Sequence, residues 1–381
     1  MEQLTQEDNL RLNVLLANQV QAIRIDESKM VVYGLSAKGN AKVQLHPNCR
    51  DEVYLRYVRE LISGQILGSP GGYPTYLKRW NRMGQARADN LAQLLLLGEP
   101  EAVIAVVHAP SLTPELARRA WWALPDSDNA RSLLKNSQIV QSELGQILAH
   151  YLVEYLPFEE EASRIIESVR LVLQPGLITE TTRQALWNKG RNKNAYLVGF
   201  LEAQPDNLPN PIAARADAPQ IQTTLAPLVA KENHIAIQLI KVISGRGQAF
   251  LATSEQVLRK PANQEVVNIL FEVIAYYFAT IRPQSYDDEM NILSLVERAH
   301  HYCDTCLDRT AVEQREILAL MPELRETIIA MLILSGLSYS VLRPIFSHTT
   351  AIGSLMRKKL APVINPLLEQ MAILQRNSDS I

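Results

Sequence analysis

The sequence predicts a mainly α-helical protein, in which a small N-terminal α+β cap precedes helical-repeat-like helix pairs and a C-terminal helical domain. Three short runs rich in Val and Ile, separated by polar turns, precede residue 48, and no convincing further pair of strands follows Gly64. From Gly64 onward, apolar residues recur at spacings of three and four. An internal repeat links two helix-pair patterns that begin at Pro110 and Pro175. Together these observations place the sheet first and the helices after it.

The cap is predicted over residues 1–66. Thr5 and the acids that follow it form a helix-start signal, so the first helix is expected from Thr5 to near Asn18. Three short strands of an antiparallel sheet are expected next, within residues 20–26, 29–36 and 41–47. A second helix is expected from about Asp51 to Ser63, on an apolar stripe that comprises Val53, Leu55, Val58, Leu61 and Ile62.

Residues 67–205 are predicted to form the helical-repeat-like region. PSLTPELARRAWWALPDSDNA, from Pro110, aligns without gaps to PGLITETTRQALWNKGRNKNA, from Pro175. Each copy predicts a Pro-containing turn, a helix, a polar turn and a second helix. Stacked helix pairs of this kind bury faces that one pair cannot bury alone, as in HEAT-like and other α-solenoid arrays. Packing in the core or between helices, without a ligand, is expected for the tryptophans of the copies, Trp121, Trp122 and Trp187.

A Pro-rich linker is predicted over residues 206–227, because five prolines between Gln204 and Pro227 preclude a long regular helix. The C-terminal helical domain is expected over 228–381. Its helices are predicted within residues 234–244, 263–281, 290–302, 311–321 and 324–337. A further helix pair, interrupted at Pro362 and Pro366, is expected before a frayed end.

Composition and charge argue against several classes of protein. The chain has 381 residues, 47% of them hydrophobic, and a formal charge of −2, so no global basic field favours DNA or an anionic membrane. Three cysteines are too few for a disulfide framework and favour a reducing, cytoplasmic setting. The N-terminus lacks the basic region of a signal peptide. The longest uncharged run, Thr327 to Leu342, is too short to span a bilayer and predicts a buried helix.

The motif HHYCDTC is the first candidate for chemistry, through His300, His301, Cys303 and Cys306. A C-x-x-C spacing lets two thiols meet, and neighbouring imidazolium groups lower a thiol pKa, which suits redox chemistry or sulfur transfer. A structural zinc site needs four convergent ligands, and no second pair follows, so no metal is expected. The alternative is structural: two small buried residues at a helix end, with the histidines capping its last turn.

The second candidate is a basic and aromatic segment after the cap, comprising Tyr73, Tyr76, Lys78, Arg79, Trp80 and Arg82. Cations interleaved with stackable rings are typical of single-stranded RNA binding. The glycine-rich turn before them lacks the Lys-Ser/Thr pair that completes a phosphate-binding P-loop. The alternative is a rigid Gly/Pro loop whose rings pack the cap onto the helical region.

The stretches that carry a family resemblance lie in about the first 180 to 210 residues. They are NLRLNVLLAN, VQAIRIDESKMVVYGLS, GSPGGYPTYLKRW, LLLLGEPEAVIAVVHAPSLTPELARRAWWALP, YLVEYLPFEEE and SVRLVLQPGLI. In these stretches the chain resembles the DsrS family, the accessory protein encoded with the reverse dissimilatory sulfite reductase system of sulfur-oxidising bacteria. The resemblance implies a soluble, cytoplasmic protein without an assigned enzymatic activity. It carries no functional residue across.

Three functional hypotheses follow, in order of preference. The first is a non-enzymatic accessory or regulatory protein of sulfur oxidation that binds a pathway protein through a helical surface. Its basis is the array-like repeat and the absence from the sequence of G-x-S-x-G, H-E-x-x-H, EF-hand and kinase signatures. The second is thiol or persulfide handling through Cys303 and Cys306, and the third is RNA binding through the segment from Tyr73 to Arg82. No catalytic residue and no cofactor are predicted.

Overall fold

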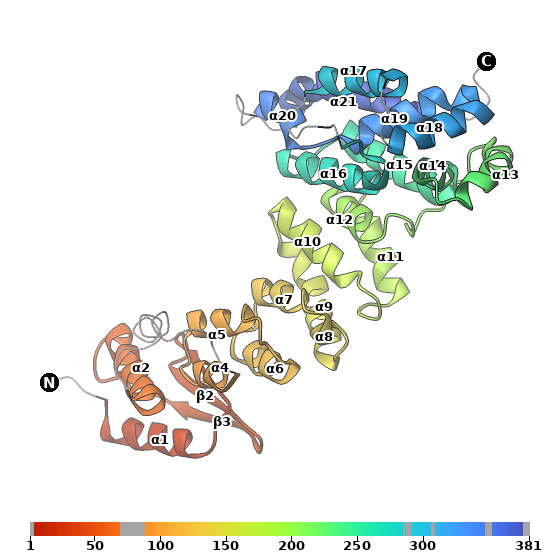
Figure 1. The fold of residues 1–381 in the computed structure, drawn as a ribbon. Coiled ribbons are helices and arrows are strands. Elements are labelled where there is room, and N and C mark those ends of the chain that lie inside the picture. The colour runs from red at the N-terminus through yellow and green to blue at the C-terminus, as the bar shows by residue number, and fades with distance from the viewer. Residues whose placement is uncertain are drawn as a thin grey trace. The chain divides into compact units, whose positions relative to one another are not determined.

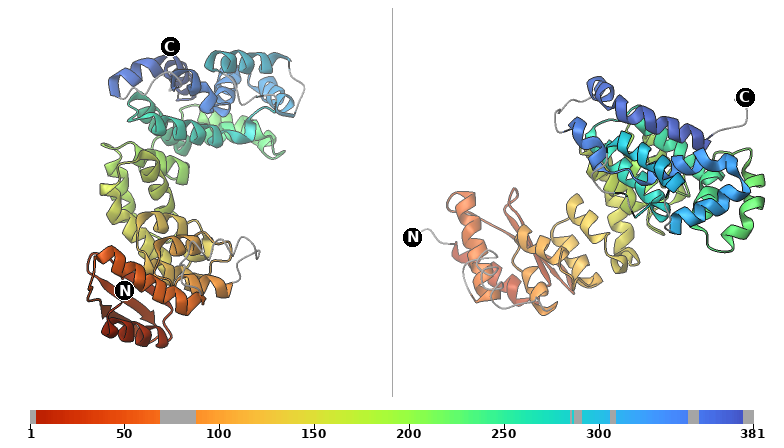
Figure 2. Two further views of the ribbon diagram at one scale, coloured as in Figure 1. Left: turned by 90° about the vertical axis from the view of Figure 1, so that its left-hand side faces the viewer. Right: turned by 45° about the horizontal axis from the view of Figure 1, so that its top comes forward.

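The chain folds mainly into helices, with one small sheet near the N-terminus (Figure 1). The computed structural model describes residues 4–68, 88–284, 286, 291–305, 309–346 and 353–375. The chain divides into two compact units, Met1–Tyr155 and Leu156–Ile381. The sheet belongs to the first unit, which runs from red to yellow in the two further views (Figure 2).

The sheet of the first unit is antiparallel and has the order β1-β2-β3, as the sequence predicts. Its strands are β1 (Ala22–Asp26), β2 (Val31–Ser36) and β3 (Gly39–Gln44). Val32 lies opposite Ile25 on one side and Val43 on the other. Directly after the tight turn from β2, β3 begins with Gly39 at φ +119°, a backbone conformation that L side chains rarely adopt.

Two helices cover one face of this sheet, α1 (Gln6–Ala17) and α2 (Asp51–Leu67). Thr5 caps α1, because its hydroxyl accepts a hydrogen bond from the Asp8 backbone N–H at 3.2 Å. Buried side chains of both helices meet the sheet in one core, among them Leu12, Leu15, Val58 and Ile62. Gly34 lets α1 approach β2, since a Cβ there would lie 2.9 Å from Leu15 Cδ1.

The first unit continues through further helices. They are α4 (Ala88–Leu94), α5 (Pro100–Val107), α6 (Pro114–Ala123), α7 (Ser127–Leu133), α8 (Ser137–Val140) and α9 (Glu143–Tyr155). The Arg24 guanidinium of β1 lies over the rings of Tyr33 and Trp122, and the Ile23 N–H donates to the Leu95 carbonyl at 2.8 Å. These contacts join the cap to the helices after it, so the unit extends past the predicted boundary at residue 66.

The described residues of the second unit form helices joined by turns and loops, with no strand among them. Its first part contains η1 (Leu156–Phe158), α10 (Ala162–Val172), α11 (Glu180–Lys189), α12 (Ala195–Ala203), α13 (Ala218–Val229), α14 (His234–Ile243), α15 (Gly245–Arg259) and α16 (Gln264–Tyr277). Its second part contains η2 (Ala279–Ile281), α17 (Ile292–Thr305), α18 (Arg309–Leu320), η3 (Pro322–Leu324), α19 (Arg325–Ser335), α20 (Tyr339–Phe346) and α21 (Gly353–Gln375). All five predicted C-terminal helices are confirmed.

Helix α15 was not among the predicted helices, because Gly245 and Gly247 interrupt its start and suppress a helical pattern. Ser244 ends α14 and also caps α15: its hydroxyl donates to the Lys241 carbonyl at 2.6 Å and accepts from the Gly247 N–H at 3.3 Å. A Cβ at Gly247 would lie 2.4 Å from the Val242 carbonyl oxygen. The glycine therefore permits the sharp corner between the two helices.

The Pro-rich segment 206–227 lies inside the second unit, whereas the sequence places a linker there. Residues 206–217 contain no helix or strand, but α13 starts at Ala218 with Pro219 in its first turn, where a missing N–H costs nothing. The Arg215 N–H donates to the Ile243 carbonyl at 2.9 Å, and Asp206 pairs with Lys241 at 2.9 Å. These bonds attach the segment to α14.

The C-terminal tail forms one helix, α21, so the predicted interruption at Pro362 and Pro366 is wrong. Pro362 is exposed and Pro366 half-buried, which keeps the lost hydrogen bonds off the packed face. The packed face continues through both prolines, with Leu360, Val363, Leu367 and Met371 all buried. Packing against α19 and α15 outweighs the local cost of the prolines.

Helix α19 is buried from Thr327 to Ser335, in agreement with the sequence prediction. In the described part of the chain, no single helix is both long and apolar enough to cross a membrane. Pro322–Ser335 and Tyr339–Phe346 reach that length and apolarity only as a pair bent by 66°.

Candidate functional site: a groove at the ends of α10, α12 and α16

Three helices of the second unit pack together and bound a cavity of about 550 Å³. We call it the helix-end groove. Its lining residues are Arg170, Leu201, Glu202, Ala203, Pro205, Ile269, Glu272, Val273, Tyr276 and Tyr277. An apolar floor with a few convergent polar groups is the usual composition of a binding site.

The helices α10 and α12 approach closely because of Gly199. A Cβ at this position would lie 2.7 Å from Val169 Cβ and 2.9 Å from the Ile166 carbonyl oxygen. The contact brings the Arg170 side chain beside Glu202, with Nε 3.1 Å from Oε1. Gly199 therefore permits the close packing of α10 on α12 that brings these two charged side chains together.

The three helices run in the same direction. At their amino ends, the Ser163 N–H of α10 donates to Glu265 Oε2 of α16 at 3.3 Å. At their carboxyl ends, Gln204 Nε2 donates to the Leu173 carbonyl at 2.7 Å, next to the pair of Arg170 and Glu202. The groove thus lies at the C-terminal ends of three helices. The last carbonyl groups of a helix have no partner within it, so these ends carry a partial negative charge.

Acidic groups outnumber basic groups here. Burial raises the pKa of the Glu202 carboxyl, Arg170 lowers it, and the nearby carboxylates of Glu167 and Glu272 raise it again, which leaves it above its usual value. Glu202 and Arg170 are each 36% exposed, so their ion pair is reachable from solvent. The lining of the groove therefore has two carboxylates, Glu202 and Glu272, against the single guanidinium of Arg170.

Two neighbouring tyrosines of α16 have different roles. Tyr277 is buried: its ring stacks on Phe250 at 3.9 Å between centroids, and its hydroxyl lies 3.2 Å from Asp206 Oδ1. Burial, together with the Asp206 charge, holds the pKa of Tyr277 far above its ordinary value, so the phenol stays neutral and acts as a wall. Tyr276, by contrast, is 85% exposed at the rim.

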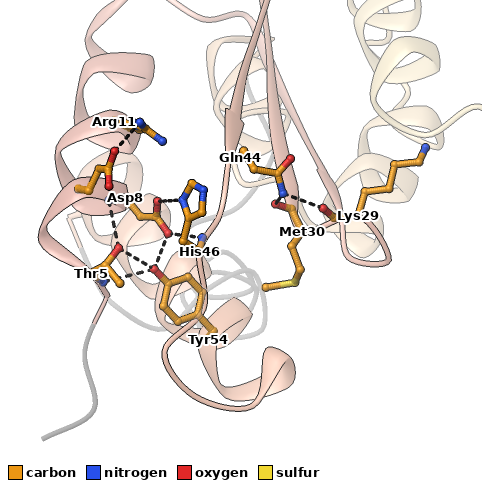
Figure 3. Close-up of polar contacts among 9 residues, drawn as sticks. Thr5, Asp8, Arg11, Lys29, Met30, Gln44, His46 and Tyr54 are labelled. Carbon is orange, nitrogen blue, oxygen red and sulfur yellow. Dashed lines mark hydrogen bonds and ion pairs between the residues drawn. The ribbon is translucent and has the colours of Figure 1, made fainter.

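A separate polar cluster lies in the first unit, where Asp8 of α1 is completely buried (Figure 3). Asp8 Oδ2 accepts from the His46 backbone N–H at 2.7 Å and the Tyr54 hydroxyl at 2.6 Å, and Oδ1 lies 3.2 Å from His46 Nδ1. Burial raises the pKa of Asp8, but these hydrogen bonds more than offset it, so the pKa lies below its usual value. Because both oxygens are engaged, the cluster ties α1 to α2 and to the loop between β3 and α2.

The structure places part of the predicted thiol motif on the last turns of α17. His300 and Cys303 are both half-buried and lie on one face of the helix, three residues apart, while His301 is exposed. Cys306 lies outside the described residues. Within those residues, no group of three or more His, Cys, Asp or Glu side chains is arranged to hold a metal ion. The thiol hypothesis stays a prediction.

The predicted RNA-binding residues lie outside the described part of the chain. They are Tyr73, Tyr76, Lys78, Arg79, Trp80 and Arg82. Trp121 and Trp187 of the repeat pack between helices as predicted, with Trp121 edge-on to Tyr151 at 4.9 Å and Trp187 edge-on to Phe200 at 5.1 Å, whereas the ring of Trp122 lies under Arg24 of β1.

The groove residues were not predicted from the sequence. Glu202 and Arg170 belong to different helices and have no motif spacing, so only the packing of α10 on α12 brings them together. One signal was present: Glu272 and Tyr276 stand four residues apart on the exposed face of the apolar helix α16.

No protein-family model matches the chain, and neither a curated protein nor a solved structure is significantly similar to it.

Proposed function

We propose that this chain is a non-enzymatic, cytoplasmic accessory or regulatory protein of dissimilatory sulfur oxidation, which binds a pathway protein through the helix-end groove. The groove carries the proposal. It sets the exposed ring of Tyr276 and the guanidinium of Arg170 beside an apolar floor of Leu201, Ile269 and Val273. Tyrosine and arginine beside apolar pockets dominate the binding energy of protein interfaces.

The pathway and the compartment have a separate basis. The stretches that resemble the DsrS family suggest sulfur oxidation, and the three cysteines of the chain suit a reducing compartment. The stacked helix pairs support a binding role, since arrays of this kind present extended surfaces to partners.

Site-specific photo-crosslinking tests the proposal. A benzophenone amino acid replaces Tyr276 in the full-length protein, which is expressed in a sulfur-oxidising bacterium and irradiated, and the adducts are identified by mass spectrometry. The expected result is one dominant adduct with a sulfur-oxidation protein. The matched control carries the same group at Tyr339, which is 46% exposed on α20, and is expected to lack that adduct.

A binding assay with the captured partner completes the test. Tyr276→Ala should weaken its affinity by roughly 10- to 30-fold, the usual effect of removing an interface hot spot. Tyr339→Ala should leave the affinity unchanged. Equal crosslinking from both positions, or an affinity that Tyr276→Ala does not change, would place the interaction elsewhere and refute the proposal.

A further inference from the structure

The charges around the helix-end groove restrict what can occupy it. Glu202 and Glu272 in its lining supply two carboxylates, while Arg170 supplies one cation. On the far side of Tyr277, Lys241 and Asp206 form an ion pair at 2.9 Å and neutralise each other. The lining therefore keeps an excess of one negative charge, to which the partial negative charge at the C-terminal ends of three helices adds.

The aromatic and apolar lining suits the rest of a basic side chain. Tyr276, one helical turn after Glu272, offers an exposed ring for a cation–π contact. Leu201, Ile269 and Val273 offer apolar surface to an aliphatic stem. An acidic or purely apolar segment would cover the Glu272 carboxylate without bringing it a compensating charge, which is costly.

We infer that the partner protein inserts a basic side chain into the helix-end groove, with arginine preferred to lysine. The guanidinium is planar, so it can pair with a carboxylate of Glu202 or Glu272 and stack on Tyr276 at the same time, whereas an ammonium is a compact point charge. This inference rests on the proposed function and names the chemistry by which the partner is recognised.

Methyl NMR of the full-length protein tests the inference with a defined probe. N-acetylarginine methylamide is titrated and followed at the methyl groups of Leu201, Ile269 and Val273. The comparison probe is N-acetylcitrulline methylamide, which has the same shape and no charge. The arginine probe should shift these methyl signals saturably, with an affinity at least about tenfold higher than that of citrulline, the difference expected for about 1.4 kcal/mol.

Isosteric variants assign the effect to the carboxylates. Glu202→Gln and Glu272→Gln should each weaken binding of the arginine probe by roughly 3- to 10-fold. Glu323→Gln, an exposed site on η3 of the same unit, makes the same charge change and should have no effect. Equal affinities for arginine and citrulline on the wild-type protein would overturn the inference, whatever the variants do.

The two proposals fail separately. If the Tyr276 adduct is a pathway protein joined through a segment without arginine or lysine, the proposed function stands and the basic-group inference is wrong. If the arginine probe binds in the groove and Tyr276 gives no protein adduct, the preference for a basic group stands and the proposed function is wrong.

Discussion

Asp8 is the clearest case in which one side chain holds several elements together. Its buried carboxylate accepts hydrogen bonds from the His46 backbone and from Tyr54, which also accepts a hydrogen bond from the Thr5 N–H at 3.3 Å. The segment before α1, the loop after β3 and helix α2 therefore meet at one charged group. A buried charge is tolerated only where donors satisfy it, as they do here.

Replacement of Asp8 by asparagine is expected to destabilise the first unit by roughly 1–3 kcal/mol, because a buried donor loses its charged acceptor. The measurement is urea unfolding of the full chain at pH 7, followed by circular dichroism. Glu7→Gln removes an exposed pair with Arg11 and should change the free energy of unfolding by less than about 0.5 kcal/mol. Equal effects of the two variants would contradict the structural role of Asp8.

The cost of Asp8→Asn should also depend on pH. The pKa of Asp8 is lower in the folded state than in the unfolded state, so its charge stabilises the fold above the unfolded value of about 3.9. That stabilisation is lost as the pH falls through the folded pKa. The difference between wild type and variant should therefore shrink as the pH falls from 7 to about 2, as measured by the same urea unfolding. A difference that stays constant over this range would mean that the charge contributes nothing.

Elements whose signals are local were predictable from the sequence, and elements set by tertiary packing were not. The Thr5 cap and the residues of α1 were predicted correctly because capping chemistry lies within one turn. Helix α21 was predicted as a pair because Pro362 and Pro366 act locally, whereas the apolar face that overrides them is stabilised by other helices. Helix α15 was missed for the same reason, because its glycines weaken the local helical pattern, whereas in the fold Gly247 packs against α14 and Gly245 against the Ile212 carbonyl.

The packing of α10 on α12 gives a sharp test at the level of elements. Gly199→Ala places a methyl group against Val169 and should destabilise the second unit by about 1–3 kcal/mol through overpacking. Gly64→Ala in α2, where nothing lies within 4 Å of an added Cβ, should stabilise the first unit by about 0.5–1 kcal/mol. Both are measured by chemical denaturation. A stabilising Gly199→Ala would show that the helices can separate at no cost.

For the molecule as a whole, the repeat was predicted but not its division between two units. The first copy forms α6 and α7 in the first unit, and the second forms α11 and α12 in the second. Sequence similarity between the copies reports shared local structure and does not report where one hydrophobic core ends. The helix-end groove was equally inaccessible, because its charges come from three helices that only the fold brings together.

Two compact units, each with its own buried core, predict two unfolding transitions in scanning calorimetry of the full chain. Asp8→Asn should lower the midpoint of one transition only, and Gly199→Ala the midpoint of the other. A single transition that both variants shift equally would show that the units unfold as one.

The corner at Ser244 has a consequence for how the length of this chain can change. One residue ends α14 and starts α15, so no spare backbone separates the two helices. An inserted residue would rotate all of α15 by about 100° about its axis and turn Phe250 and Leu258 out of the core. We therefore expect related chains to align without gaps across residues 241–248, and an engineered one-residue insertion there to abolish folding of the second unit.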